Sequence, residues 1–140
     1  MGRIIAIDFG QKRVGVAVTD ELRMIATPLE TVHSKDILSF LKRYISAENV
    51  DCIVVGEPLQ MNNEKSESAA FVDPFVKSLH KTFPELQIDR MDERFTSKMA
   101  SAAILTAGLK KKDRQDKALV DKVSAVIILQ SYLEMKAWQH

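Results

Sequence analysis

The sequence predicts an α/β domain built on a five-stranded mixed sheet with helices on both faces. Short runs of β-branched and other apolar residues, which are typical of buried strands, recur through residues 1–91. Between and after them lie longer segments in which apolar residues recur every three or four positions, as they do in amphipathic helices. The order along the chain is β-β-β-α-β-α-β-α, which indicates a mixed sheet covered by helices.

The first strand is the segment around which we expect the functional site. Residues 4–7 are continuously apolar, as in a strand covered on both faces, and Asp8 falls at the carboxyl end. Ligands of open α/β sheets bind at that end, so a carboxylate held there is a candidate for chemistry. Taken alone, an Asp-x-Gly sequence is more often a turn in which the aspartate caps the backbone.

Two further strands follow the first. Residues 13–20 alternate valine with small residues, and the short link before them predicts an antiparallel hairpin with Gly10 at a positive φ. Residues 25–32 read as a third strand. Pro28 cannot donate a backbone hydrogen bond, so this strand is not expected in the centre of the sheet.

The middle of the chain alternates helices with strands. Ser34 is a candidate N-cap for a helix with an apolar stripe over 37–45, and residues 50–55 predict a buried strand. A polar loop follows, and then a second helix that reaches about Phe83. Residues 86–91 predict the fifth strand.

The last third of the sequence predicts two helices joined by a basic loop. Thr96 or Ser97 can cap the first, which ends at Gly108. The second begins at Ala118 and is apolar on nearly every face from Val123 onward, so we expect it to pack against the sheet.

Composition limits the class of protein. With 140 residues, 46% hydrophobic and 28% charged, the chain is expected to form one domain, 1–140, with a sizeable core. It lacks an apolar run of the roughly 20 residues that a membrane span needs, and its start does not resemble a signal peptide, so we expect a cytoplasmic protein without membrane contact. Cys52 lies in an apolar run and is expected in the core. A net charge of only +1 means that nucleic-acid affinity must come from local basic clusters.

Three acidic residues stand where a charge needs a partner. Asp8 and Glu93 follow apolar strands, and Asp121 shares a helical stripe with Ala125 and Ile128. If the two strands are neighbours and the helix crosses them, the three carboxylates converge and repel one another unless a cation lies between them. Oxygen ligands suit Mg²⁺ or Mn²⁺, and two such ions can activate water against a phosphodiester. Each carboxylate alone could instead form a salt bridge or a cap.

Basic residues close to these carboxylates are candidates for nucleic-acid contacts. Arg13 and Arg94 are each suited either to bind a phosphate or to pair with a site carboxylate. The densest basic cluster leads into the helix with Asp121 and comprises Lys110, Lys111, Lys112, Arg114 and Lys117. A solvated loop is the alternative for such a run of charge. The cluster contains no aromatic residue, which favours recognition of the phosphate backbone over base stacking.

Four motifs, in their order and spacing, resemble one known family over essentially the whole chain. They are Asp8-x-Gly10-x-x-Arg13-x-Gly15-Val16-Ala17, Val55-Gly56-x-Pro58-Leu59, Asp92-Glu93-Arg94-x-Thr96, and Asp121-Lys122-x-x-Ala125 with Ile128-Leu129-Gln130 and Tyr132-Leu133. The family is the YqgF type, also called pre-16S rRNA nucleases or Holliday-junction-resolvase-like proteins. The resemblance implies an RNase H-like fold and a nuclease that uses the counterparts of Asp8, Glu93 and Asp121 as catalytic metal ligands. It also implies a role in processing the end of 16S rRNA.

The resemblance also implies partners and leaves alternatives. Structured RNA is the expected substrate, with DNA junctions as a second class and the ribosome precursor as a partner; the oligomeric state is expected to be a monomer or a weak homodimer. A binding module that grips structured nucleic acid without efficient cleavage is the alternative. An actin-like ATPase, which shares the Asp-x-Gly hairpin, needs two such domains and ranks last.

The sequence departs from the family pattern in several places, none of which removes a candidate ligand. Glu57 stands where the family usually has an apolar residue, and residues 61–64 replace a Met-Asp-Gly type of stretch. We expect Glu57 to face solvent, and an additional site carboxylate is the alternative.

Overall fold

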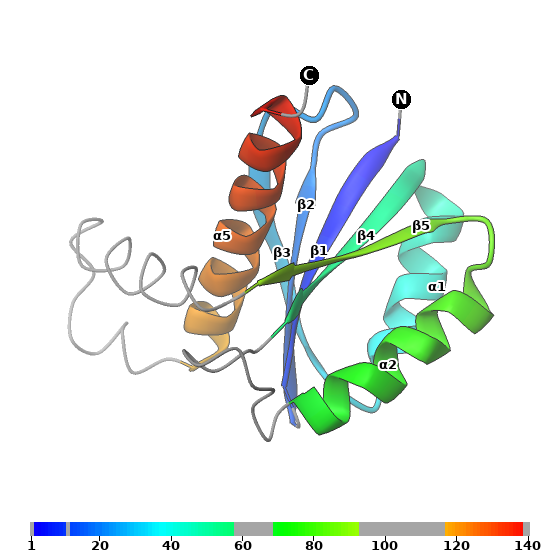
Figure 1. The fold of residues 1–140 in the computed structure, drawn as a ribbon. Helices are drawn as coiled ribbons and strands as arrows, with labels where there is room; N and C mark the ends of the chain where they lie inside the picture. The colour runs from blue at the N-terminus through cyan, green and yellow to red at the C-terminus, as the bar shows by residue number, and fades with distance from the viewer. Residues whose placement is uncertain (1, 11, 58–68, 93–116, 139–140) are drawn as a thin grey trace.

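The structure is a computed structural model, and it describes residues 2–10, 12–57, 69–92 and 117–138 (Figure 1). The strands are β1 (Arg3–Phe9), β2 (Arg13–Thr19), β3 (Ala26–His33), β4 (Val50–Glu57) and β5 (Gln87–Asp92). The helices are α1 (Ile37–Ala47), α2 (Ala69–Thr82) and α5 (Lys117–Trp138). The helix expected to begin near Thr96, the basic loop after it and the loop over 60–66 lie outside the described residues.

The strands form one five-stranded sheet in the order β3-β2-β1-β4-β5. β2 runs antiparallel to both β1 and β3, whereas β4 is parallel to both β1 and β5. The carboxyl ends of β1, β3, β4 and β5 therefore lie at one end of the sheet. The mixed sheet is confirmed, and β3, which contains Pro28, is an edge strand as expected.

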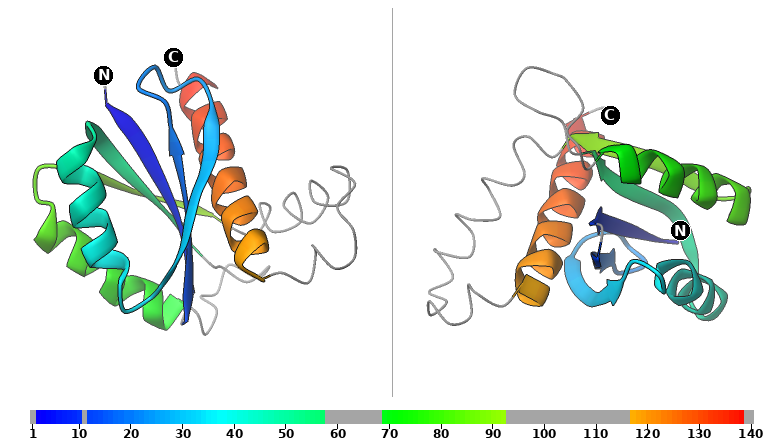
Figure 2. Two further views of the ribbon diagram at one scale, coloured as in Figure 1. Left: turned by 180° about the vertical axis from the view of Figure 1, so that it is seen from behind. Right: turned by 90° about the horizontal axis from the view of Figure 1, so that it is seen from below.

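The two faces of the sheet build two cores. Ile5 and Ile7 of β1 pack in a cluster with residues of α1 and α2, whereas Ile4 and Ala6 pack in a second cluster with residues of α5. Successive side chains of a strand point to opposite faces, so this division follows directly from the register. Figure 2 shows the same arrangement, with α1 and α2 on one face of the sheet and α5 on the other.

The apolar stripes of the helices agree with the sequence prediction. In α1, Ile37 and Leu41 are buried, and Leu38 and Ile45 pack beside them. In α5, the residues from Ala125 to Tyr132 supply the buried contacts with the sheet. None of the helices in the described ranges is long and apolar enough to cross a bilayer.

Two local predictions are wrong. The N-cap of α1 is Asp36 and not Ser34, because the backbone N–H of Ser34 donates to the carbonyl of Lys12 and the chain makes one more turn before the helix begins. Gly10 does not adopt a positive φ. It is required for a different reason: a Cβ at this position would lie 2.7 Å from the carbonyl oxygen of Arg13, the acceptor of the N–H of Gly10.

Candidate metal and nucleic-acid site

Asp8 lies at the carboxyl end of the central strand, on the face of the sheet that α5 covers. It alternates with Ile4 and Ala6, which pack against that helix. The next residue, Phe9, turns to the opposite face, where its ring stacks on Phe75 of α2 with centroids 4.3 Å apart. The stacked rings hold the end of β1 in place and so keep the half-buried carboxylate of Asp8 on the α5 side.

Both strands beside Asp8 carry glycine at the neighbouring position. Gly15 of β2 is its register partner. On the other side, Ile7 pairs with Val55, so Gly56 is the next residue of β4 along the strand. The register neighbours of Asp8 therefore carry no side chain on either strand, which leaves room for a metal ion at the end of β1.

Asp121 lies in the first turns of α5. The fully buried residues Ala125 and Ile128 follow it by four and seven positions, so the expected inward stripe is confirmed for these two residues. Figure 1 shows that α5 begins at the end of the sheet where β1 finishes. The backbone of Asp121 is thus at the same end of the molecule as Asp8, while its side chain is outside the described part.

The third predicted ligand, Glu93, is outside the described residues, and it follows directly after β5. The last residues of β4 and β5, Glu57 and Asp92, are register partners, so the chain leaves both strands at the end where Asp8 lies. Convergence of the three carboxylates therefore stays a prediction, as does the orientation of Glu57. Among the described residues, no group of three or more His, Cys, Asp and Glu residues could hold a metal ion.

Of the predicted nucleic-acid contacts, only Arg13 has a described side chain. It is exposed at the start of β2 and alternates with Gly15 and Ala17, which places it on the α5 face, as Asp8 is. Lys117 begins α5, but its side chain is not described. The other residues of this prediction lie outside the described ranges: Arg94, Lys110, Lys111, Lys112 and Arg114.

The structure places three further polar residues beside Arg13 that the sequence analysis missed. His33 at the end of β3 is the register partner of Arg13. Lys12 accepts a backbone hydrogen bond from the residue after His33, and Lys35 follows in the same turn. The sequence feature that could have revealed these residues is the third strand. Its pairing with the second strand brings residues about 20 positions apart into contact.

A polar contact ties α5 to β5. The hydroxyl of Tyr132 donates to the carboxylate of Asp89, and the thiol of Cys52 lies 3.8 Å from the same hydroxyl. Burial, and then the bond to Asp89, raise the pKa of Tyr132. Burial also raises the pKa of Cys52 to about 11, so this thiol is an unreactive core group, as expected.

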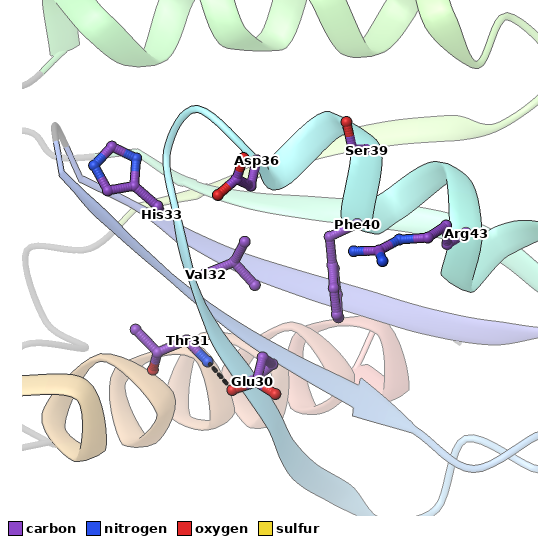
Figure 3. Close-up of a pocket in the computed structure, with 8 residues that line it drawn as sticks. All are labelled: Glu30, Thr31, Val32, His33, Asp36, Ser39, Phe40 and Arg43. Carbon is purple, nitrogen blue, oxygen red and sulfur yellow. Dashed lines mark hydrogen bonds between the residues drawn. The ribbon is translucent and has the colours of Figure 1, made fainter.

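A shallow pocket of about 710 Å³ lies between β3 and α1 (Figure 3). Glu30 and Val32 of β3 and Phe40 and Arg43 of α1 are among its lining residues. The register partners of Glu30 and Val32 are Val16 and Val14, which pack on the α1 and α2 side of the sheet. Most of the pocket therefore lies on the face opposite Asp8, and His33, at the end of β3, also lines it.

Comparisons with known proteins agree with this architecture. A family model described as "RuvX: Holliday junction resolvase" matches residues 2–135. The chain is 56% identical over 136 residues to a protein of Bacteroides thetaiotaomicron named "Putative pre-16S rRNA nuclease", with 97% of this chain and 99% of that protein covered. A protein of the same name from Flavobacterium psychrophilum is 51% identical over 136 residues, with the same two shares covered.

Two solved structures share the fold at low sequence identity. The resolvase of Fowlpox virus, in complex with substrate Holliday junction DNA, matches with a TM-score of 0.63 and 13% identity, covering 96% of this chain and 98% of that one. RuvC of T. thermophilus, in complex with a Holliday junction substrate, matches with a TM-score of 0.55 and 20% identity, covering 96% of each chain. These likenesses confirm the predicted RNase H-like fold.

Proposed function

The chain belongs to the family of Holliday junction resolvases described as RuvX, and from this membership we propose that it is a metal-dependent nuclease that hydrolyses phosphodiester bonds of nucleic acid. Its relatives are named for pre-16S rRNA, so the proposed substrate is the end of the 16S rRNA precursor, met in the cytoplasm during ribosome assembly. The proposed oligomeric state is a monomer or a weak homodimer. The observation that carries the proposal is the position of Asp8, at the end of the central strand between two glycines.

Asp8, Glu93 and Asp121 are the proposed catalytic metal ligands. Support comes from the α5 side of the sheet, to which Asp8 and the stripe of Asp121 both belong, and from the oxygen donors, which suit Mg²⁺ or Mn²⁺. Such ions supply an activated water and stabilisation of the leaving oxygen. The buried segment over residues 4–7 supports the position of Asp8, and Asp121 precedes the fully buried residues of α5.

Arg13, Arg94 and the basic segment are the proposed contacts with the phosphate backbone. The segment comprises Lys110, Lys111, Lys112, Arg114 and Lys117. The exposed guanidinium of Arg13 lies on the same face as Asp8 and could bind a phosphate oxygen in a bidentate manner. With a net charge of only +1, local clusters of this kind must supply the attraction.

The test compares the intact chain with Asp8→Asn on labelled substrates. The panel is a precursor rRNA end, a duplex, a single strand and a four-way DNA junction, each with Mg²⁺, Mn²⁺ or a chelator. Asp8→Asn should slow cleavage by more than the roughly 10- to 100-fold that outer-shell groups contribute at metal sites, because it removes a ligand charge. Glu134→Gln is the matched control, since it neutralises an exposed carboxylate on α5 and should leave the rate unchanged.

Equal residual cleavage by the intact chain and by Asp8→Asn would contradict catalysis at this site. Binding without cleavage in both proteins would favour the second candidate, a module that grips structured nucleic acid. The family description favours one further comparison: faster cleavage of the four-way junction than of the rRNA end would make the chain a junction resolvase and not an rRNA-processing enzyme.

A further inference from the structure

Two turns bring the backbone of four polar residues together near the end of β1. The β1–β2 hairpin contributes Lys12 and Arg13, and the turn after β3 contributes His33 and Lys35. Arg13 and His33 are register partners, and the backbone N–H of Ser34 donates to the carbonyl of Lys12 at 3.1 Å. The side chains of all four polar residues are exposed.

The ring of His33 has a defined orientation. Its Nδ1 accepts a hydrogen bond from the backbone N–H of Lys35 at 3.1 Å. An acceptor Nδ1 means a neutral ring whose proton is on Nε2, on the side away from Lys35. Figure 3 shows this ring at the end of β3, where it lines the pocket and is turned away from Phe40 and Arg43. His33 therefore presents an N–H donor on the side of the ring away from Lys35.

The balance of charge in these two turns is positive. Lys12, Arg13 and Lys35 are cationic, and Asp36 is the one carboxylate within residues 12–13 and 33–36. Arg13 precedes Gly15, the partner of Asp8, by two residues in β2, which corresponds to about 7 Å along the strand. One nucleotide of a duplex strand spans about 3.4 Å of the axis, so the surface is one to three nucleotides from a phosphate that would bind at the proposed metal site of Asp8.

We propose that Lys12, Arg13, His33 and Lys35 form a phosphate-binding surface that holds the nucleic-acid backbone on the β3 side of Asp8. The inference rests on the proposed function and extends it by three residues, Lys12, His33 and Lys35. The surface binds backbone and not bases, because it combines cations and an N–H donor without an aromatic side chain in either turn. It also orients the strand, since it fixes which side of Asp8 the backbone crosses.

Equilibrium binding to labelled probes tests this surface without cleavage. In the Asp8→Asn background, fluorescence anisotropy measures the affinity for a labelled single-stranded RNA and a labelled DNA duplex over a range of salt concentrations. Lys12→Gln with Lys35→Gln should weaken binding about tenfold near 0.1 M salt and lower the slope of log affinity against log salt by about 1.4 to 1.8. The control is Lys77→Gln with Lys81→Gln, which removes the same charge from exposed positions on α2 and should change neither quantity.

His33→Ala separates the hydrogen bond from the charge. This substitution should weaken binding severalfold and leave the salt slope unchanged, because a neutral donor releases no counterion. An unchanged affinity would exclude His33 from the surface.

The two proposals fail in different ways. If Lys12→Gln with Lys35→Gln binds both probes as tightly as its parent, or if the α2 control loses as much affinity, the surface proposed here is wrong. If the Asp8→Asn parent binds neither probe at any salt concentration, the proposed function itself fails.

Discussion

At the scale of single residues, the protonation of one buried thiol affects stability. Cys52 is 4% exposed in β4, and burial raises its pKa from 9.0 to about 11. In the unfolded chain the thiol loses its proton near its ordinary pKa, whereas in the folded protein it keeps the proton until higher pH. The folded state then binds more protons than the unfolded state, so stability falls as the pH rises through this window.

We expect the free energy of unfolding to fall between about pH 9 and pH 11, by up to about 2 to 3 kcal/mol from Cys52 alone. Urea unfolding of the intact chain and of Cys52→Ala at several pH values measures this effect. The variant has no thiol to titrate, so its stability should decline less steeply over the same range. If the stability of the two proteins fell in parallel with pH, the proposed effect of the Cys52 thiol would be contradicted.

At the scale of elements, the contact between α5 and β5 connects the segments that lead to Asp121 and Glu93. In the described part of the sheet β5 is an edge strand beside β4, and the hydroxyl of Tyr132 reaches its residue Asp89 from the helix. The bond is partly buried, so it is screened less by water than a surface contact would be. The position of α5 relative to β5 therefore depends on this hydrogen bond as well as on apolar packing.

Tyr132→Phe should lower the free energy of unfolding by about 1 to 3 kcal/mol, because it leaves a partly buried carboxylate without one of its donors. The matched control is Gln87→Ala, since Gln87 donates to the same oxygen of Asp89 at 2.7 Å from an exposed position. That substitution should cost less than about 0.5 kcal/mol. Chemical denaturation checks both values, and equal losses would contradict the importance of the buried bond.

At the scale of the whole molecule, the sheet joins two cores that do not touch each other. Leu41 of α1 is fully buried on one face, and Ile128 of α5 is fully buried on the other. The strands are shared by both cores, so loss of either should unfold the whole domain. The site at the carboxyl end of β1 depends on both, because Phe9 is held from one face and Asp8 is presented on the other.

Leu41→Ala and Ile128→Ala should each lower the free energy of unfolding by about 2 to 5 kcal/mol. The double variant should lose the sum of the two within about 0.5 kcal/mol, since the residues share no partners. Urea unfolding followed by far-UV and near-UV circular dichroism measures this. Two separate transitions, or a marked departure from additivity, would contradict a single cooperative domain.

The sequence by itself determined the elements of this protein and their order. Runs of apolar residues and helical stripes are properties of neighbouring positions, so the strands, α1 and α5 follow from them within a residue or two. The same local patterns predicted Asp8 at a strand end and an edge position for Pro28. They erred at Ser34, where a contact between two turns decides the backbone, and at Gly10, where a contact within the hairpin does.

Only the tertiary structure decided what lies beside the site. The two glycines that flank Asp8 and the pairing of Arg13 with His33 come from strands that are distant in sequence. A shift of the register by one residue would move every side chain of a strand to the other face, so the pairing of distant strands decides which side chains meet at the site. The sequence therefore identifies the carboxylate at the end of the strand. The folded sheet decides which residues surround it.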